Sequence, residues 1–209
     1  MANLGNPPIQ NKSDLKRFES ELTLQERLPE HSILDVFINT AERTPDATAI
    51  SMLMTGKTGE NPRNISYKDL LGQIRRAANL FTDIAGTGPG VAFMLPALIE
   101  THVTLWGAET AGYAVPINFL LQPESIAELI RASDAKILVA LGPHPQLDIW
   151  EKAVTIRENI PGLLLLRISP PGTPPVKSVI DFDSALMAQP ETHLIFDQVR
   201  GGADVAAYF

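Results

Sequence analysis

The fold is decided by one stretch, Leu105–Ala140, which reads LWGAETAGYAVPINFLLQPESIAELIRASDAKILVA. Its residue types predict a helix that ends at Gly112, a buried strand over Tyr113–Ile117, a second helix and a second buried strand. We expect Gly112 to end the first helix in the left-handed conformation that glycine adopts easily. Pro123 is suited to open the second helix, because its missing N–H needs no partner in the first turn. The stretch is therefore predicted to be a βαβ unit.

The sequence on both sides of this stretch continues the alternation of strands and helices. Strands are predicted over Ala47–Met54 (short and buried), Val91–Leu95, Gly162–Ile168 and Ala203–Phe209, and helices after the caps Ser32 and Ser66 and over Ala97–Ala111, Gln146–Asn159 and Val179–Ala188. Residues 55–64 are predicted to form a hairpin or loop. Strands that alternate with helices of this length indicate an α/β fold with a doubly wound, mostly parallel sheet flanked by helices.

The chain divides most simply at changes of composition. Residues 1–30 are polar without a sustained apolar period and are predicted to be an arm, and residues 31–168 form the α/β subdomain. Residues 169–209 begin with the linker SPPGTPP and end with the trailing helix and strand.

Composition excludes several classes of protein. With 209 residues, 44% of them hydrophobic, the chain can bury an ordinary core. A net charge of −7 would repel a phosphate backbone, so we expect no nucleic-acid partner. The chain has no cysteine, no secretory signal pattern at its start, and no uninterrupted apolar run long enough to cross a membrane. We therefore expect a cytoplasmic location and no membrane span.

Residue patterns alone predict no catalytic residue and no metal site. The glycines of GTGPG, 86–90, leave a helix and enter a strand, which is the reverse of a phosphate-binding loop, so we interpret them as a helix cap and a turn. The four histidines are scattered without metal-ligand spacing. Asp181 and Asp183 are two positions apart, and helix capping with solvation explains them.

Three motifs carry a resemblance to a known family. ISYKDL at Ile65–Leu70, GPGVAFMLP at Gly88–Pro96 and GAETAGYAVPIN at Gly107–Asn118 follow one another with the order and separation found in adenylate-forming enzymes. The resemblance covers Ser32–Phe209. Asn118, where peptide-synthetase adenylation domains have Asp, is followed by Phe119 and Leu120, and this wording is more similar to the AMP-forming acyl-CoA synthetases.

The resemblance implies a reaction and one candidate site. The family joins a carboxylate to the thiol of CoA through an acyl-adenylate, so the complete enzyme would use ATP, Mg²⁺ and CoA and would act in fatty acid metabolism. In some of these ligases the loop after the matching strand lies near the route of CoA. By that resemblance Asn118 and Phe119 are the candidate cofactor-binding residues, at the rim of the CoA route. The alternative is a strand end that caps the next helix.

The sequence also departs from the family. A loop rich in Ser, Thr and Gly follows the strand matching DVAAYF in the family and wraps the ATP phosphates, whereas this sequence ends at Phe209. We therefore expect no cofactor in the 209 residues and an amino-terminal fragment that is inactive alone. Two alternatives stay open: a noncatalytic binding or assembly module with this fold, and a flavodoxin-like domain that binds a small ligand at its strand ends. An exposed sheet edge would favour self-association.

Overall fold

The computed structural model describes residues 9–27, 30–169, 174–197 and 200–209. The chain divides into two compact units, Met1–His31 and Ser32–Phe209. The first unit contains the helices α1 (Lys12–Glu21) and α2 (Leu24–Arg27). Asn11 caps α1 by accepting from the backbone N–H groups of Ser13 and Asp14, and none of the α1 residues is buried. The apolar pattern did not predict α1, because that helix has no buried face.

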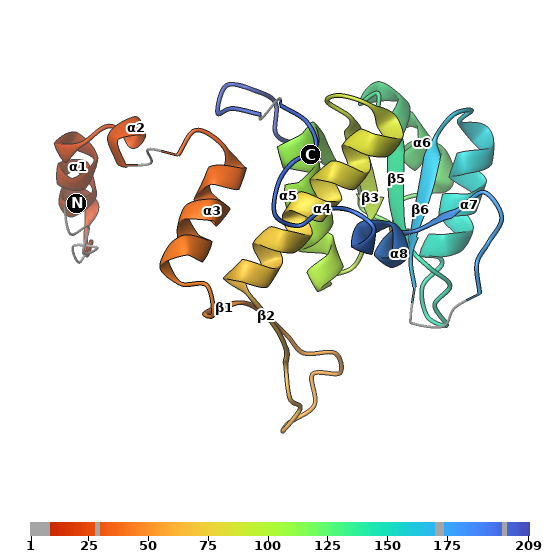
Figure 1. Cartoon of the computed structure of the whole chain (residues 1–209), viewed down its shortest axis with the longest axis horizontal. Coiled ribbons are helices and arrows are strands. Elements are labelled where there is room, and N and C mark those ends of the chain that lie inside the picture. The colour runs from red at the N-terminus through yellow and green to blue at the C-terminus, as the bar shows by residue number, and fades with distance from the viewer. Residues whose placement is uncertain (1–8, 28–29, 170–173, 198–199) are drawn as a thin grey trace. The chain divides into compact units, whose positions relative to one another are not determined.

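The second unit is built around a five-stranded parallel sheet, in the order β4-β3-β5-β6-β7 (Figure 1). The strands are β3 (Gly90–Met94), β4 (Tyr113–Pro116), β5 (Ile137–Leu141), β6 (Leu164–Ile168) and β7 (Ile180–Asp181). All four pairings between neighbours are parallel. The order reverses direction between β3 and β5, which is the pattern of a doubly wound sheet. The predicted α/β class and parallel sheet are confirmed.

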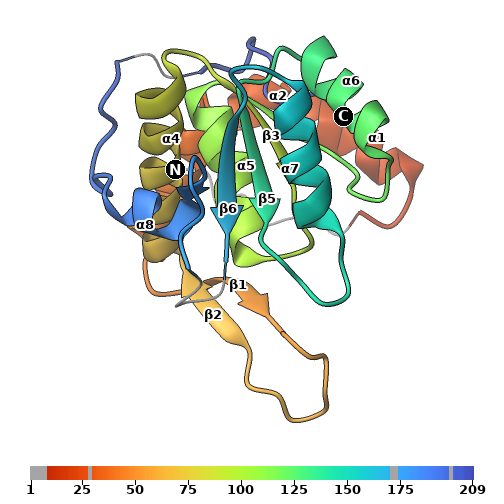
Figure 2. The ribbon, with the colours of Figure 1, turned by 90° about the vertical axis from the view of Figure 1, so that its right-hand side faces the viewer.

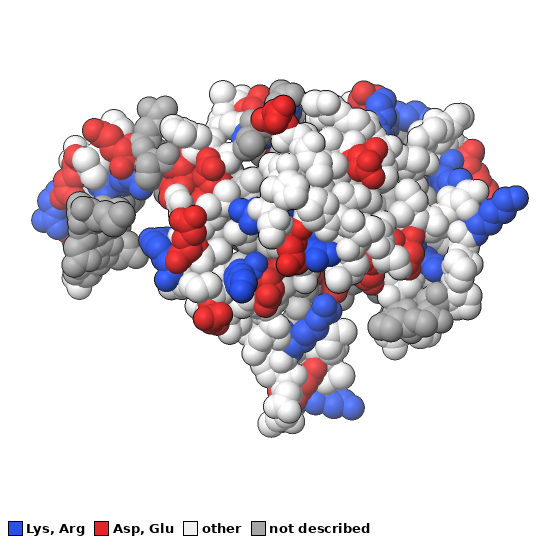
Figure 3. Space-filling model, viewed as in Figure 1, with Lys and Arg blue, Asp and Glu red and all other residues white. Residues whose placement is uncertain are grey.

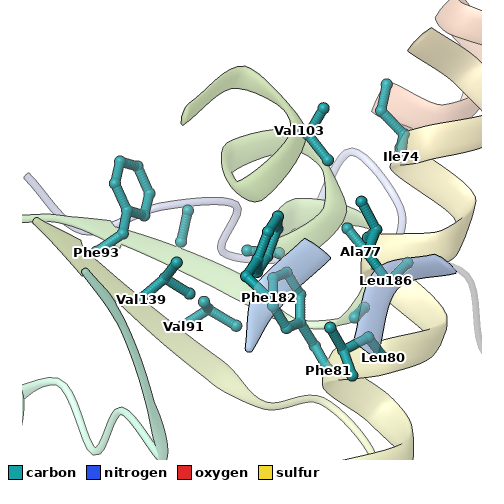
Figure 4. Packing of buried hydrophobic residues seen from close by; sticks show 14 of the residues in the cluster. Ile74, Ala77, Leu80, Phe81, Val91, Phe93, Val103, Val139, Phe182 and Leu186 are labelled. Atoms are coloured by element: carbon teal, nitrogen blue, oxygen red, sulfur yellow. The ribbon is translucent and has the colours of Figure 1, made fainter. Parts of the chain in front are cut away.

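Helices cover both faces of this sheet (Figure 2). They are α4 (Tyr67–Ala85), α5 (Ile99–Ala111), α6 (Pro123–Ala132), α7 (Ile149–Asn159) and α8 (Phe182–Met187). The helix α3 (Ile33–Arg43) packs on α4 and α5. Alternate residues of β3 point to opposite faces: Val91 and Phe93 join the core beneath α4, α5 and α8, whereas Ala92 and Met94 join the core beneath α6 and α7. Figure 4 shows the first core, in which Phe81 of α4 lies beside Phe182 of α8 with ring centroids 6.4 Å apart. The most extensive contact between two helices on this face is that of α4 with α5.

Local sequence explains where α4 begins and ends. The hydroxyl of Ser66 accepts from the backbone N–H of Asp69 and donates to its carboxylate, which satisfies the first turn. Gly86 has φ of 81° and closes the helix with its N–H on the carbonyl of Thr82. The helix presents the predicted apolar face, in which Leu70, Leu71, Ile74, Ala77, Ala78 and Phe81 are all buried. The interpretation of GTGPG as a helix cap and turn is confirmed.

A two-stranded antiparallel hairpin precedes α4, formed by β1 (Thr48–Met52) and β2 (Arg63–Ser66). Its loop, residues 53–62, contains most of the predicted loop or hairpin over residues 55–64, and residues 63 and 64 belong to β2. A strand does form within the predicted range Ala47–Met54, but the prediction that it is buried is wrong, because no residue of β1 is fully buried. Among the described residues the strand β1 pairs only with β2, outside the five-stranded sheet, so its apolar residues are not enclosed on both faces.

Two further predictions need correction. Residues 203–209 form no strand; a single parallel bridge joins Ala207 to Ala114 of β4. Gly112 does end α5, but with φ of −162° rather than in the left-handed conformation. Glycine is required there by space, since a Cβ would lie 2.2 Å from the carbonyl oxygen of Pro89.

Element boundaries near the end of the chain also differ from the predictions. The helix expected over Val179–Ala188 is shorter, because Ile180–Asp181 extends the sheet as β7 before α8 begins. The helix expected from Gln146 begins at Ile149. Of the linker SPPGTPP, residues 170–173 lie outside the part that the structure describes.

Candidate functional site

The candidate residues Asn118 and Phe119 follow the carboxyl end of β4, at the edge of the sheet where the parallel strands end. Asn118 is exposed, and its carboxamide oxygen accepts from the backbone N–H of Leu120 at 3.0 Å. Its carbonyl accepts from the N–H of Leu121 at 3.2 Å. These two bonds hold residues 118–121 in a tight turn. The turn directs the chain toward α6, which begins at Pro123.

Phe119 is half-buried against the core beneath α6 and α7. Its carbonyl accepts from the ammonium of Lys152 at 2.9 Å, and Lys152 also pairs with Asp148 at 3.2 Å. This ammonium joins the turn after β4 to the first turn of α7. Phe119 and Lys152 therefore fix the turn by contacts that do not depend on a ligand.

A hollow of about 450 Å³ opens beside this turn. Its walls are formed by Phe119 and Leu120 on one side and by His144, Pro145, Gln146, Leu147, Asp148 and Glu151 on the other. The Nδ1 atom of His144 accepts from the backbone N–H of Gln146 at 3.2 Å, so the proton of a neutral imidazole is on Nε2. Asn118 does not line the hollow. The structure thus brings Phe119, but not Asn118, together with the loop after β5.

A second polar group at the same sheet edge joins three elements. Arg63 of β2 donates to Glu100 in the first turn of α5 at 2.8 Å. Asp183 lies in the first turn of α8. Desolvation raises the pKa of the Asp183 carboxyl, the charges of Glu100 and Asp181 raise it further, and Arg63 opposes them. No local pattern predicts this group, since its residues are up to 120 positions apart in the sequence and form no motif.

Asp181 behaves as the sequence predicted. Its carboxylate caps α8 by accepting from the N–H of Ser184 at 3.0 Å, and this hydrogen bonding lowers its pKa. Asp183 does not act as a cap, and the desolvation of its carboxyl distinguishes it from a merely solvated one.

A buried arginine lies at the end of β6. Arg167 is only 2% exposed and donates to the carbonyl of Pro174 at 2.8 Å. Its guanidinium carbon lies 5.7 Å from the ring centre of Trp150. Within the described residues its Nε has no hydrogen-bond partner. Through these two contacts Arg167 holds the chain at Pro174 and packs against Trp150 of α7.

The reversal point between β3 and β5 is where doubly wound sheets usually bind ligands. Here the connection from β3 to α5 contains Pro96, which has no N–H, and Leu98, whose backbone N–H is bonded to Thr101. A phosphate would need free backbone N–H groups in a glycine-rich turn at this position. The connection therefore does not fit a bound nucleotide, and the flavodoxin-like alternative gains no support from it.

The described residues also offer little for a metal or for nucleic acid. Among them no group of three or more His, Asp or Glu side chains is placed to hold a metal ion. No helix within the described ranges is long and apolar enough to cross a membrane. On the face of the second unit in Figure 3, acidic and basic side chains are interspersed rather than gathered in one basic patch.

Comparison with known proteins adds the following. The profile of a family described as AMP-binding enzyme matches residues 37–196. The chain is 30% identical over 207 residues to a marinolic acid–CoA ligase of Pseudoalteromonas sp. (strain SANK 73390), which covers 98% of this chain and 31% of the ligase. The chain thus spans about a third of the length of that relative.

Solved structures resemble the chain in fold. An acyl-CoA synthetase of Brucella canis superposes with a TM-score of 0.67 at 21% identity, covering 82% of this chain and 30% of the synthetase. A benzoate CoA ligase from Burkholderia xenovorans LB400 superposes with a TM-score of 0.68 at 18% identity, covering 86% of this chain and 32% of the ligase. At these identities the likeness establishes the fold alone.

Proposed function

Because the chain belongs to the AMP-binding enzyme family, we propose that its 209 residues are the amino-terminal part of an acyl-CoA ligase. The complete enzyme would convert a carboxylic acid, ATP and CoA into acyl-CoA, AMP and pyrophosphate. The observation that carries this proposal is the 30% identity to a CoA ligase over nearly the whole chain. A chain that spans 31% of its relative supplies only part of such an enzyme.

In this proposal the 209 residues form part of the scaffold of the enzyme and supply no catalytic group. ATP chemistry needs donors aimed at the phosphates and a Mg²⁺ ion held between oxygen atoms. The described residues do not fit either group: the glycines at 86–90 leave a helix, and no cluster of acidic residues is placed to hold a metal ion. We therefore derive no reaction step for this chain, and we propose that it is inactive by itself.

We further propose that the hollow beside Phe119 accommodates the uncharged pantetheine arm of CoA. Phe119 and Leu120 offer an apolar wall, and Leu120 is 72% exposed. The opposite wall carries the carboxylate of Glu151, which would repel the phosphates of CoA, whereas the carboxylate of Asp148 is paired with Lys152. Charge thus favours the thiol-bearing arm over the nucleotide at this position. Asn118 would shape the rim, since its carboxamide holds Leu120 in place.

The experiment for this site uses a longer protein that contains these residues and continues past Phe209. Leu120→Asp adds a carboxylate to the hollow and should raise the KM for CoA by about fivefold or more through repulsion and lost apolar contact. Acid-dependent exchange of pyrophosphate into ATP involves no CoA and should be unchanged. Leu129→Asp is the matched control, because Leu129 of α6 is also exposed (46%) and lies outside the hollow. An unchanged KM for CoA in Leu120→Asp would exclude the site.

We propose a fatty acid as substrate and a cytoplasmic location for the complete enzyme, and only the family resemblance supports both. A panel of aliphatic acids of increasing length and aromatic acids, assayed by pyrophosphate exchange with the longer protein, would test the substrate. Exchange with aromatic acids alone would exclude fatty acids. The location would be tested by fractionating cells of the source organism.

The coding sequence after codon 209 distinguishes the proposed ligase from a noncatalytic module. A frame that continues into a loop rich in Gly, Ser and Thr and containing a lysine supports the ligase. A stop codon directly after codon 209 in an intact operon supports the module.

A further inference from the structure

The segment after α8, Gln189–Phe196, is held on helix α4 by side chains, and we call it the strap. Within it the described residues form neither helix nor strand. It follows β7 and α8, which lie at the edge of the sheet opposite β4, and the chain then reaches β4 at Ala207. Figure 1 shows this course in blue, across α4 toward the end of the chain. The strap therefore determines from where residues 203–209 approach the sheet.

Asn79 makes the central contact with the strap. It lies on α4, is 0% exposed, and uses both ends of its carboxamide. Its Nδ2 donates to the carbonyls of Pro190 at 3.0 Å and of His193 at 2.9 Å. Its Oδ1 accepts from the backbone N–H of Ile195 at 2.9 Å. One buried side chain thus satisfies three backbone groups that lie more than 110 positions away in the sequence.

Arg76 and Asp83, one helical turn to either side of Asn79, hold the start of the strap. Arg76 donates to the carbonyl of Met187 at 2.8 Å and pairs with Glu191 at 2.7 Å. Gln189 donates to the carboxylate of Asp83 at 3.3 Å. The side chains of Leu194 and Phe196 then pack against the core beneath α4 and α5. The outer contacts are exposed, so the buried bonds of Asn79 are the specific ones.

Fewer contacts attach residues 203–209 to the sheet than attach the strap to α4. The N–H of Ala114 donates to the carbonyl of Ala206, and the N–H of Tyr208 donates to the carbonyl of Ala114, both at 2.9 Å. The rings of Tyr113 and Tyr208 meet edge to face at 5.4 Å. Val205, Tyr208 and Phe209 are exposed. Two backbone bonds give little net stability against the entropy of ordering the segment.

We propose that Asn79 is a positioning residue, which fixes the strap on α4 and thereby holds residues 203–209 at the edge of β4 in one register. Ten residues, 197–206, lie between the strap and Ala207. Fixing one end of so short a connection restricts where the other end can pair. Because the bridge is parallel to β4, it directs the chain at Phe209 toward the edge where the strands end. In the ligase proposed above, on which this last step rests, Asn79 would set where the ATP-phosphate loop begins.

The first test uses the 209-residue chain and measures amide hydrogen exchange by NMR. In Asn79→Ala, exchange of the Tyr208 N–H should accelerate by about tenfold or more relative to core amides such as that of Val139. Asn79→Asp keeps an acceptor for Ile195 but turns a buried carboxylate oxygen toward the carbonyls of Pro190 and His193, so exchange of the Tyr208 N–H should accelerate at least as much as in Asn79→Ala. Thr82→Val is the matched control, because the Thr82 hydroxyl of the same helix is buried and has no partner among the described residues. Unchanged relative exchange of Tyr208 in Asn79→Ala would overturn the proposal. If Asn79→Ala does not fold, the uncharged Asn79→Ser, which keeps one hydroxyl to replace part of the hydrogen bonding, gives the same comparison.

The second test uses the longer protein and separates positioning from general stability. If ATP binds only when the loop is correctly placed, Asn79→Ala should raise the KM for ATP by roughly five- to tenfold with kcat unchanged. Loss of folded enzyme would instead lower kcat without changing KM. A lower kcat at constant KM for ATP in Asn79→Ala would overturn the proposal that Asn79 sets the position of the ATP-phosphate loop. If the longer protein with the wild-type sequence shows no exchange of pyrophosphate into ATP, the proposed function fails. The amide hydrogen exchange of Tyr208 in the 209-residue chain still decides the role of Asn79.

Discussion

The contact between α4 and α5 and the sheet edge where the strands end are built on opposite principles. Between the helices, small and apolar residues pack closely: a Cβ on Gly107 would lie 2.4 Å from the Cβ of Ala77. At the sheet edge, polar side chains such as Arg63 and Glu100 meet while still partly exposed, and a hollow of about 450 Å³ remains open. The first region specifies the fold, and the second leaves groups available to a ligand or to further polypeptide.

The difference predicts that equal truncations will have unequal effects. Phe81→Ala, in the core beneath α4, should cost about 3–5 kcal/mol of unfolding free energy, because Phe81 is 0% exposed and its removal leaves a cavity. Leu120→Ala at the sheet edge should change it by less than about 0.5 kcal/mol. Urea denaturation of both variants measures this. Equal losses would show that the turn after β4 is part of the core.

Two glycines on facing helices sharpen the comparison. Gly107→Ala should destabilise by about 1–3 kcal/mol, because its Cβ would approach Ala77 too closely. Gly72→Ala on α4 should stabilise by up to about 1 kcal/mol, since the nearest atom to its Cβ is at an ordinary 3.5 Å and alanine favours the helix. Thermal unfolding of both variants measures whether the Tm falls in Gly107→Ala and rises in Gly72→Ala. A stable Gly107→Ala variant would contradict the close approach of α4 and α5.

A third prediction concerns the pH dependence of stability, and it compares the half-buried carboxyl of Glu109 with the more exposed carboxyl of Asp183. Burial raises the pKa of Glu109 on α5, and it also raises that of Asp183. A carboxyl whose folded pKa is raised contributes stability below its unfolded pKa, and this contribution is lost as pH rises through the folded pKa. Glu109→Gln should therefore remove part of the stability loss between about pH 4 and pH 7.

Asp183→Asn should act in the same direction but less, since more than a third of its surface is exposed and solvent screens its charge. Denaturation midpoints at the two pH values measure both variants. A Glu109→Gln variant with the wild-type pH dependence would show that Glu109 is fully hydrated in the folded protein.

The smallest effect is expected for the pair Arg63 and Glu100. With Arg63 53% exposed, the coupling energy from a double-mutant cycle should be about 0.2–1 kcal/mol and should fall with added salt. A coupling well above this range would mean that the hairpin is fixed rigidly to α5.

The same contrast explains what the sequence could predict. The face of α4 that carries Ile74 and Ala77 has helical spacing, and the strands are continuous apolar runs, so local pattern was sufficient for the α/β fold. The bonds from Asn79 to the strap and the meeting of Arg63 with Glu100 join residues far apart in sequence, and no local spacing encodes them. The strand expected over residues 203–209 failed for a related reason, because pairing depends on a neighbour and not on apolar composition alone.

The candidate site was located by resemblance only. Resemblance pointed to the loop of Asn118 and Phe119, but the facing wall at His144–Asp148 was not predicted. Loops that meet across a sheet edge have no common sequence signal, and the sheet order that brings them together is a property of the whole fold.

The central claim is that these residues supply the scaffold of an acyl-CoA ligase and not its chemistry. The most direct measurement is CoA-dependent release of AMP from ATP, with a panel of carboxylic acids, by the purified 209-residue chain and by a longer protein that continues past Phe209. We predict AMP release from the longer protein and none from the 209 residues. AMP release by the 209-residue chain alone would contradict the account.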